Sequence, residues 1–227
     1  MTVSSPQATI TVVMIAELEV WRKLFDTKAR ELYPATDPAH DFLHIQRVAG
    51  SAMTIAREEG ADLWIVLPAA YFHDFVSIPK NDPRRAQASV LSADAAAEYL
   101  SGAGYPGQYL DGIHHAIAAH SFSAGISCET IEAKVVQDAD RLDSLGGVGI
   151  ARCFTTTALM SRPYYEEHDP FAEHRAPDDK DYAVDHFFVK LFKLSDTLHT
   201  RAARLEAARR VAFMHDYLKQ LRSEIVP

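Results

Sequence analysis

The chain has 227 residues and a formal net charge of −8, with 48% hydrophobic and 24% charged residues. These values are typical of a globular protein with a sizeable core. The negative charge argues against a nucleic-acid polymer as the partner, because binding a phosphate backbone requires a concentrated basic surface. It does not argue against a small anionic ligand held in one local pocket.

The first twenty residues contain a short apolar patch without a preceding basic region, and the patch soon meets Glu17 and Glu19. We interpret this stretch as the approach to a first helix rather than as a signal peptide. No apolar run approaches 18 residues, so no membrane span is expected. Cys128 and Cys153 form no zinc-binding pattern, and free thiols are the expected state. We therefore expect a cytoplasmic protein with no membrane partner.

Helical periodicity dominates the chain, and strand alternation is hard to find. Asp37 followed by Pro38 predicts a helix start, and Gly60 predicts the end of that helix. The segment after Gly60 is apolar nearly all round, which indicates a central buried helix. Helices are expected at about residues 9–32, 39–59, 61–75, 84–101, 107–120, 129–145, 147–161, 182–198 and 201–224. The pattern predicts one all-α domain over residues 1–227.

The segment 161–182 differs from the rest because it is polar, has little periodicity and carries three prolines. A connection of this length in a compact domain is often a lid or a binding loop. Surface decoration is the alternative interpretation.

Polar side chains occur on helix faces that are otherwise apolar. His44 heads a stripe that continues through Val48, Ala52 and Ile55. A single inward-facing histidine is more often a core residue with a hydrogen-bond partner than a ligand. His44 alone is therefore weak evidence for a ligand, and two further groups of polar residues on apolar faces are needed to support that role.

The second place is the pair His73 and Asp74 at the end of the buried helix, and the third is Asp140 and Asp143, which continue an apolar face at helical spacing. An isolated buried carboxylate is costly, so each needs a cation, a hydrogen-bond partner or a route to water. A divalent metal ion satisfies all three places, because imidazoles supply nitrogen ligands and the ion stabilises ionised carboxylates. His73 and Asp74 are then adjacent ligands of one ion.

The pattern H…HD…D, with its last Asp inside "DADRLDSLG", resembles the HD-domain superfamily of metal-dependent phosphohydrolases. The strings "AHDFLHIQRV", "HSFSAGI", "KVVQDADRLDSLGGVGIARCF" and "DHFFVKLFKL" are similar to its small stand-alone bacterial members, some of which resemble nucleoside triphosphate pyrophosphohydrolases. The resemblance covers about residues 38–200. It implies a single compact HD-domain-like helical bundle in which one divalent metal ion is bound by His44, His73, Asp74 and Asp140. Mn²⁺ is the expected ion, with Mg²⁺, Co²⁺, Ni²⁺, Fe²⁺ and Zn²⁺ as alternatives.

Many members of this superfamily carry an acidic residue three positions after the Asp of the HD pair, where it helps to activate water. Ser77 occupies that position here. Asp143, one helical turn beyond Asp140, is the substitute candidate for a catalytic base. The alternative is a structural carboxylate that holds Arg141 or a ligand histidine.

Candidate substrate contacts are histidines and basic residues near the predicted centre. Some relatives use extra histidines for phosphate or for a second metal ion, and a helical count places His120 nearer the buried face than His115. On the helix near 182–198, a basic strip formed by His186, Lys190 and Lys193 borders an apolar stripe. The strip could bind phosphates as point charges, although a solvated face is the alternative. The substrate-binding candidates are His120, His115, His186, Lys190, Lys193, Arg141 and Arg152.

The leading functional hypothesis is a divalent-metal-dependent phosphohydrolase that acts on nucleotides and releases pyrophosphate from a (deoxy)nucleoside triphosphate. A nucleoside monophosphate phosphatase is one alternative. A nucleotide-sensing module with little turnover is another, and the serine at position 77 favours it. The expected partner is a small nucleotide, and a homodimer is compatible with the sequence.

Overall fold

The computed structural model describes residues 6–33, 41–78 and 82–225, with side chains from residue 16 onward, and the regular elements of this part of the chain are helices. The α-helices are α1 (Pro6–Leu32), α2 (Phe42–Glu59), α3 (Leu63–Phe72), α4 (Ala88–Gly102), α5 (Leu110–His120), α6 (Ile131–Leu142), α7 (Gly146–Leu159), α8 (Ala183–His186), α9 (Phe192–Leu194) and α10 (Arg201–Ile225). Short helical turns are η1 (Arg85–Gln87), η2 (Gly107–Tyr109), η3 (Phe122–Ala124), η4 (Phe187–Leu191) and η5 (Ser195–Thr197). The all-α prediction is confirmed.

Helix α2 begins and ends at residues with clear capping chemistry. The side chain of its N-cap, Asp41, accepts a hydrogen bond from the backbone N–H of His44 at 2.9 Å. Gly60 ends the helix with φ of 72°, a left-handed conformation that glycine adopts without steric cost. The predicted start at Asp37 and Pro38 lies outside the described residues. Asp41 thus fixes the beginning of the helix that carries the first candidate ligand.

Helix α3 is the central helix that its apolar sequence predicts, and it contacts α1, α2, α5 and α6. Pro68 lies inside it and cannot donate a backbone hydrogen bond to the carbonyl of Trp64. The hydroxyl of Tyr105 donates to that carbonyl instead, at 2.7 Å. The helix ends at Phe72, earlier than the predicted residue 75, so His73 and Asp74 follow its last turn. The buried ring of Phe25 and the partly buried ring of Tyr99 pack edge-on against Phe72 and hold this end in place.

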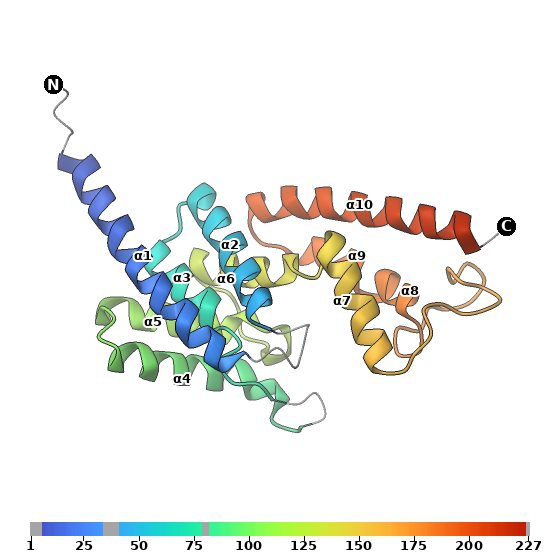
Figure 1. Cartoon of the computed structure of the whole chain (residues 1–227), viewed down its shortest axis with the longest axis horizontal. Helices are drawn as coiled ribbons and strands as arrows, with labels where there is room; N and C mark the ends of the chain where they lie inside the picture. Colours follow the sequence, from blue (N-terminus) through green and yellow to red (C-terminus); the bar gives the residue numbers. More distant parts are fainter. Residues whose placement is uncertain (1–5, 34–40, 79–81, 226–227) are drawn as a thin grey trace.

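Figure 1 shows two groups of helices, with α1 to α6 in one group and α7 to α9 in the other. The long helix α10 runs across both groups and contacts α2, α6 and α7. The predicted helix at 182–198 is composite, because α8, a π-helical turn at η4, α9 and η5 follow one another along it. The candidate ligands lie in the first group, and the basic strip lies in the second.

The segment 161–182 has an irregular backbone that is held by contacts with α8 and α10. Arg175 pairs with the fully buried Asp185, with Nη2 and Oδ1 2.8 Å apart, and Asp185 also accepts the backbone N–H of Asp178 at 2.6 Å. The ring of Phe171 is buried beneath the guanidinium of Arg222. The segment is therefore anchored at its middle and its end.

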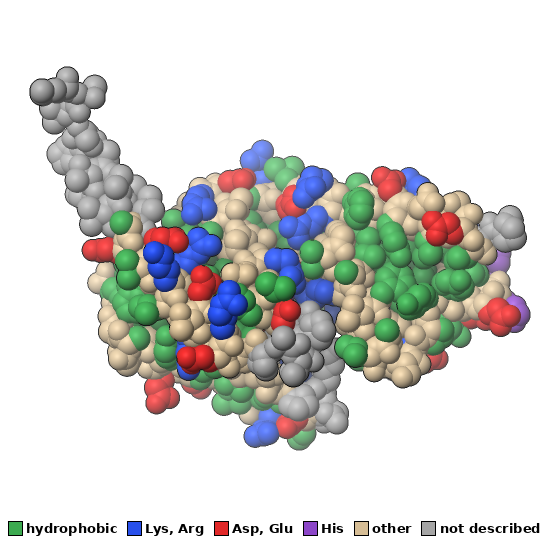
Figure 2. All heavy atoms as spheres, in the orientation of Figure 1, with side chains coloured by type: hydrophobic (Ala, Val, Ile, Leu, Met, Phe, Trp, Pro, Cys, Tyr) green, Lys and Arg blue, Asp and Glu red, His purple; other side chains and the backbone are tan. Residues whose placement is uncertain are grey.

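Lys, Arg, Asp and Glu side chains are interspersed on much of the face that Figure 2 shows. Hydrophobic side chains gather on the part of this face near α7 and the segment that follows it. Leu159 at the end of α7, and Met160 and Tyr164 after it, are exposed. Within the described residues, none of the helices is both long and apolar enough to span a membrane.

Candidate metal centre

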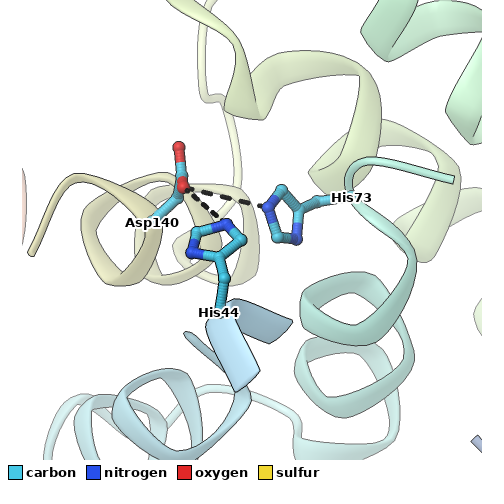
Figure 3. Close-up of side chains that lie close together, drawn as sticks. All are labelled: His44, His73 and Asp140. Carbon is cyan, nitrogen blue, oxygen red and sulfur yellow. Dashed lines mark ion pairs between the residues drawn. The ribbon is translucent and has the colours of Figure 1, made fainter. Parts of the chain in front are cut away.

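Three side chains from three helical regions converge at one point inside the first group of helices. His44 comes from α2, His73 follows α3, and Asp140 comes from α6 (Figure 3). One carboxylate oxygen, Oδ1 of Asp140, lies 3.6 Å from Nε2 of His44 and 3.8 Å from Nε2 of His73. One ligand atom from each of the three residues lies within 4.8 Å of the others. This spacing allows all three to reach a single ion.

The backbone fixes how His73 presents its ring. Its Nδ1 donates to the carbonyl of Ala70 at 2.8 Å, so the lone pair is on Nε2 and faces the cluster. Nε2 is buried and has no hydrogen-bond partner among the described residues. A buried nitrogen without a partner is costly, and a divalent cation would use its lone pair. The residues present therefore fit a metal ion.

Asp74 and His120 form a second group of possible ligands with His73. The carboxylate of Asp74 lies 3.7 Å from Nε2 of His73 through one oxygen and 3.6 Å from Nε2 of His120 through the other. Nδ1 of His120 donates to the carbonyl of Ile117 at 2.7 Å, which turns its Nε2 toward Asp74. The described residues thus form two overlapping groups that share His73, one with His44 and Asp140 and the other with Asp74 and His120.

The electrostatics of the cluster suit a cation. Burial raises the pKa of Asp74 and of Asp140, but the histidines around them outweigh this effect, and the pKa of each carboxyl lies below its ordinary value. Burial lowers the pKa of His73. Ionised carboxylates and a neutral imidazole are the forms in which these side chains bind metals.

Asp143 lies behind His44 and is 3% exposed. Its Oδ2 accepts hydrogen bonds from Nδ1 of His44 at 2.7 Å and from Nη1 of Arg152 at 2.6 Å, while its Oδ1 accepts Nε of Arg47 at 2.7 Å. Burial raises the pKa of Asp143, but these bonds and charges outweigh it and hold the pKa well below its ordinary range. Its carboxylate thus holds a candidate ligand histidine and two arginines, and Arg141 is not among its partners.

A cleft of about 1140 Å³ opens beside the cluster. Asp74, Asp140 and His120 line it, together with residues of α7, α8 and η4 from the second group of helices. The basic residues that the sequence analysis proposed for substrate also line this cleft, namely Arg141, Arg152, His186, Lys190 and Lys193. Two distant segments of the chain therefore share one cleft.

Some of these side chains have partners of their own. Arg141 donates to the carbonyl of Thr197 at 2.6 Å, and Nδ1 of His186 lies 3.0 Å from the carboxylate of Asp179. His115 is not among the described lining residues of the cleft. Its Nε2 instead accepts the backbone N–H of Glu129 at 3.1 Å.

Three further basic residues that the sequence pattern did not indicate also line the cleft, namely Arg85, Arg162 and Lys180. Nothing in the local pattern separates Arg85 from its neighbour Arg84, which is exposed and pairs with Asp82. Arg85 lines the cleft, and its Nη1 donates to the carbonyl of Ile78 at 2.7 Å. That contact depends on the turn after α3, and no local signal could have revealed it.

An all-α bundle with a buried His/Asp cluster next to a basic cleft defines a metal-dependent phosphohydrolase. The HD domain model matches residues 42–145, a range that contains the candidate ligands. The chain belongs to the HD-domain superfamily, whose domains bind divalent metal ions.

The chain is 36% identical over 190 residues to YpgQ of Bacillus subtilis (strain 168), which covers 82% of this chain and 84% of YpgQ. It is also similar to the crystal structure of YpgQ in complex with ADP, with a TM-score of 0.71, 36% identity, and coverage of 90% of this chain and 98% of that one. An HD-superfamily hydrolase of Bacillus thuringiensis is similar with a TM-score of 0.70 and 28% identity, covering 91% of this chain and 97% of that chain.

Proposed function

We propose that this phosphohydrolase acts on nucleotides and that its preferred reaction releases pyrophosphate from a (deoxy)nucleoside triphosphate. The observation that carries the proposal is a His/Asp cluster that opens into a cleft of about 1140 Å³ with Lys190 and Lys193 on its wall. A cleft of this size accommodates a whole nucleotide. The relative YpgQ, whose crystal structure is a complex with ADP, supports a nucleoside polyphosphate as the ligand.

We assign His44, His73, Asp74 and Asp140 as the ligands of one divalent ion, with Mn²⁺ as the expected metal. Such an ion, when bound, polarises a phosphoryl oxygen and lowers the pKa of a water molecule. The protein itself fixes the imidazoles, because the Nδ1 bonds of His44 and His73 leave each Nε2 directed at Asp140. The ligands are thus oriented before substrate arrives.

Lysines and arginines of the cleft hold the phosphates. Lys190 and Lys193 bind the β- and γ-phosphates as point charges, and Arg152 offers planar donors. Charge on a departing pyrophosphate is then stabilised, which favours attack at the α-phosphorus. The phosphate-binding surface is completed by Arg141, His186 and His120. His115 is not part of the proposed surface, because it accepts the backbone N–H of Glu129 and is not among the lining residues of the cleft.

Phe122 provides the surface for the nucleobase. It belongs to η3, its side chain lines the cleft, and it is 84% exposed. The flanking Ser121 and Ser123 hydroxyls bond to each other at 2.9 Å and brace the turn. An exposed aromatic ring stacks on any base, so the proposal implies broad base tolerance.

A free nucleotide in the cytoplasm is the substrate in this proposal. The net charge of −8 and the interspersed charges of the face in Figure 2 support a small molecule over a nucleic-acid polymer. A homodimer is compatible with the exposed apolar side chains near α7, and light scattering after gel filtration tests it.

Phosphorus NMR of a reaction with a deoxynucleoside triphosphate and Mn²⁺ tests the reaction directly. The expected initial products are the nucleoside monophosphate and pyrophosphate, and Asp140→Ala is the inactive control. Orthophosphate as the sole initial product would overturn the preferred bond and favour a phosphatase. Binding without turnover would favour a nucleotide-sensing module.

A further inference from the structure

The carboxylate of Asp143 joins three donors that come from two helices. His44 and Arg47 are on α2, and Arg152 is on α7. Asp143 accepts Nδ1 of His44 at 2.7 Å, Nε of Arg47 at 2.7 Å, and Nη1 of Arg152 at 2.6 Å. Asp143 is 3% exposed and does not line the main cleft, so it has no access to substrate. Asp143 can therefore affect the site only through the side chains that it holds, such as His44 and Arg152.

The two arginines differ in what else they contact. The side chain of Arg152 is 18% exposed and lines both the main cleft and a smaller pocket of about 280 Å³. Arg47 lines the smaller pocket and is not among the lining residues of the main cleft. Arg152 bonds Asp143 through Nη1 alone, and a guanidinium carries five N–H donors in one plane. Donors of Arg152 therefore remain for an anion in the cleft.

We propose that Arg152 has two tasks, holding Asp143 so that His44 is oriented for the metal ion and binding a substrate phosphate in the main cleft. Asp143 is then a positioning residue for His44. It fixes the tautomer and the ring direction, because Nδ1–H points at the carboxylate and Nε2 faces Asp140. Arg47 shares the first task but not the second. The inference rests on the proposed function only in taking the cleft ligand to carry phosphate.

Metal affinity tests the first task without reference to turnover. Calorimetric titration of the metal-free full chain with Mn²⁺ is expected to show affinity lowered about 10- to 100-fold by Asp143→Asn, Arg152→Gln and Arg47→Gln. The double variant Asp143→Asn/Arg152→Gln is expected to bind no more weakly than Asp143→Asn, since both substitutions act through one unit. Arg152→Lys, which keeps the charge, is expected to recover part of the loss.

Phosphate affinity tests the second task. With EDTA present, binding of inorganic tripolyphosphate is expected to weaken about tenfold in Arg152→Gln and to stay unchanged in Arg47→Gln, because only Arg152 lines the main cleft. The metal-free state removes any direct attraction between ion and phosphate.

Several results would overturn the proposal. Mn²⁺ affinity within twofold of the parent chain in Arg152→Gln, with only the melting temperature changed, would make the contact purely structural. Equal tripolyphosphate binding by Arg152→Gln and the parent chain would remove the second task. Should Asp143→Asn fail to fold, the two variants of Arg152, whose side chain is partly exposed in the cleft, decide the matter alone. These measurements are independent of nucleotide hydrolysis, so failure of the proposed reaction would be distinguishable from failure of this inference.

Discussion

Oδ2 of Asp138 accepts hydrogen bonds from both the backbone N–H and the hydroxyl of Thr200, each at 2.7 Å. Asp138 is fully buried, and its other oxygen accepts the backbone N–H of His199 at 2.9 Å. These bonds attach the start of α10 to α6, two residues before Asp140. Two aspartates of one helix thus differ in their contacts: Asp138 holds the start of α10, and Asp140 belongs to the candidate metal centre.

Replacing Asp138 with alanine is expected to destabilise the protein by about 3 kcal/mol or more, because several buried donors lose their acceptor at about 1–3 kcal/mol each. The melting temperature should fall by several degrees at about 2–4 °C per kcal/mol for a chain of this size. Thr200→Val, which removes only the hydroxyl, should cost less. Metal content at 25 °C should match the parent chain, and a selective loss of metal would refute the structural role.

Asp74→Ala is expected to lower the divalent metal content of the purified protein, because it removes one of the four proposed ligands. Elemental analysis of both proteins, purified side by side, measures the difference. Asp94→Ala is the matched control, since the carboxylate of Asp94 is 62% exposed and pairs with His114 on the surface. Equal metal content in Asp74→Ala and the parent chain would defeat the ligand assignment.

Removal of the metal ion is expected to lower the melting temperature, because the ion binds the folded centre and not the unfolded chain. At a free metal concentration of 100 Kd the stabilisation is about 2.7 kcal/mol, which corresponds to about 5–10 °C. Scanning calorimetry with EDTA and after Mn²⁺ is restored measures it. Asp140→Ala should show no response to Mn²⁺, and an equal response in that variant would contradict the prediction.

Lys190→Ala is expected to lower kcat/KM on a triphosphate without loss of metal or fold. A lost bond to a charged group costs about 1.5–3 kcal/mol, which is about ten- to a hundredfold in rate. Lys219→Ala serves as the control, because that side chain is 77% exposed on α10 and pairs with Asp216. Unchanged kinetics in Lys190→Ala would show that the basic strip is a solvated surface and does not bind substrate.

Phe122→Ala is expected to raise KM for nucleotides about tenfold or more, because stacking of a base on an aromatic ring contributes about 1–3 kcal/mol. Binding of inorganic tripolyphosphate, which has no base, should not change. Phe122→Tyr keeps the ring and should keep the affinity. An equal loss for both ligands would show that the substitution disturbs the η3 turn rather than a base contact.

Periodicity was sufficient to predict most of the helices, because their apolar faces have a spacing that is visible in the sequence. The helix α3 was instead predicted from its continuous apolar run. Periodicity also placed Asp140 and Asp143 on one buried face, but it could not assign a task to either. The partners that distinguish them are distant in the chain, since Asp143 bonds Arg47 across 96 positions and Asp140 lies 3.6 Å from His44 and 3.8 Å from His73. Such contacts depend on how helices pack, and no local pattern encodes them.

The π-helical turn η4 lies in the middle of the basic strip. A π-helix pairs each residue with the fifth one along rather than the fourth, so it holds an additional residue compared with the α-helix on either side. Each residue of an α-helix advances the direction of the side chain by about 100°. Loss of a single residue within Phe187–Leu191 would therefore rotate Lys193 by about that angle relative to His186 and carry its charge away from the cleft. Among homologous chains, the length of this turn therefore decides whether a lysine at the position of Lys193 lies on the wall of the cleft.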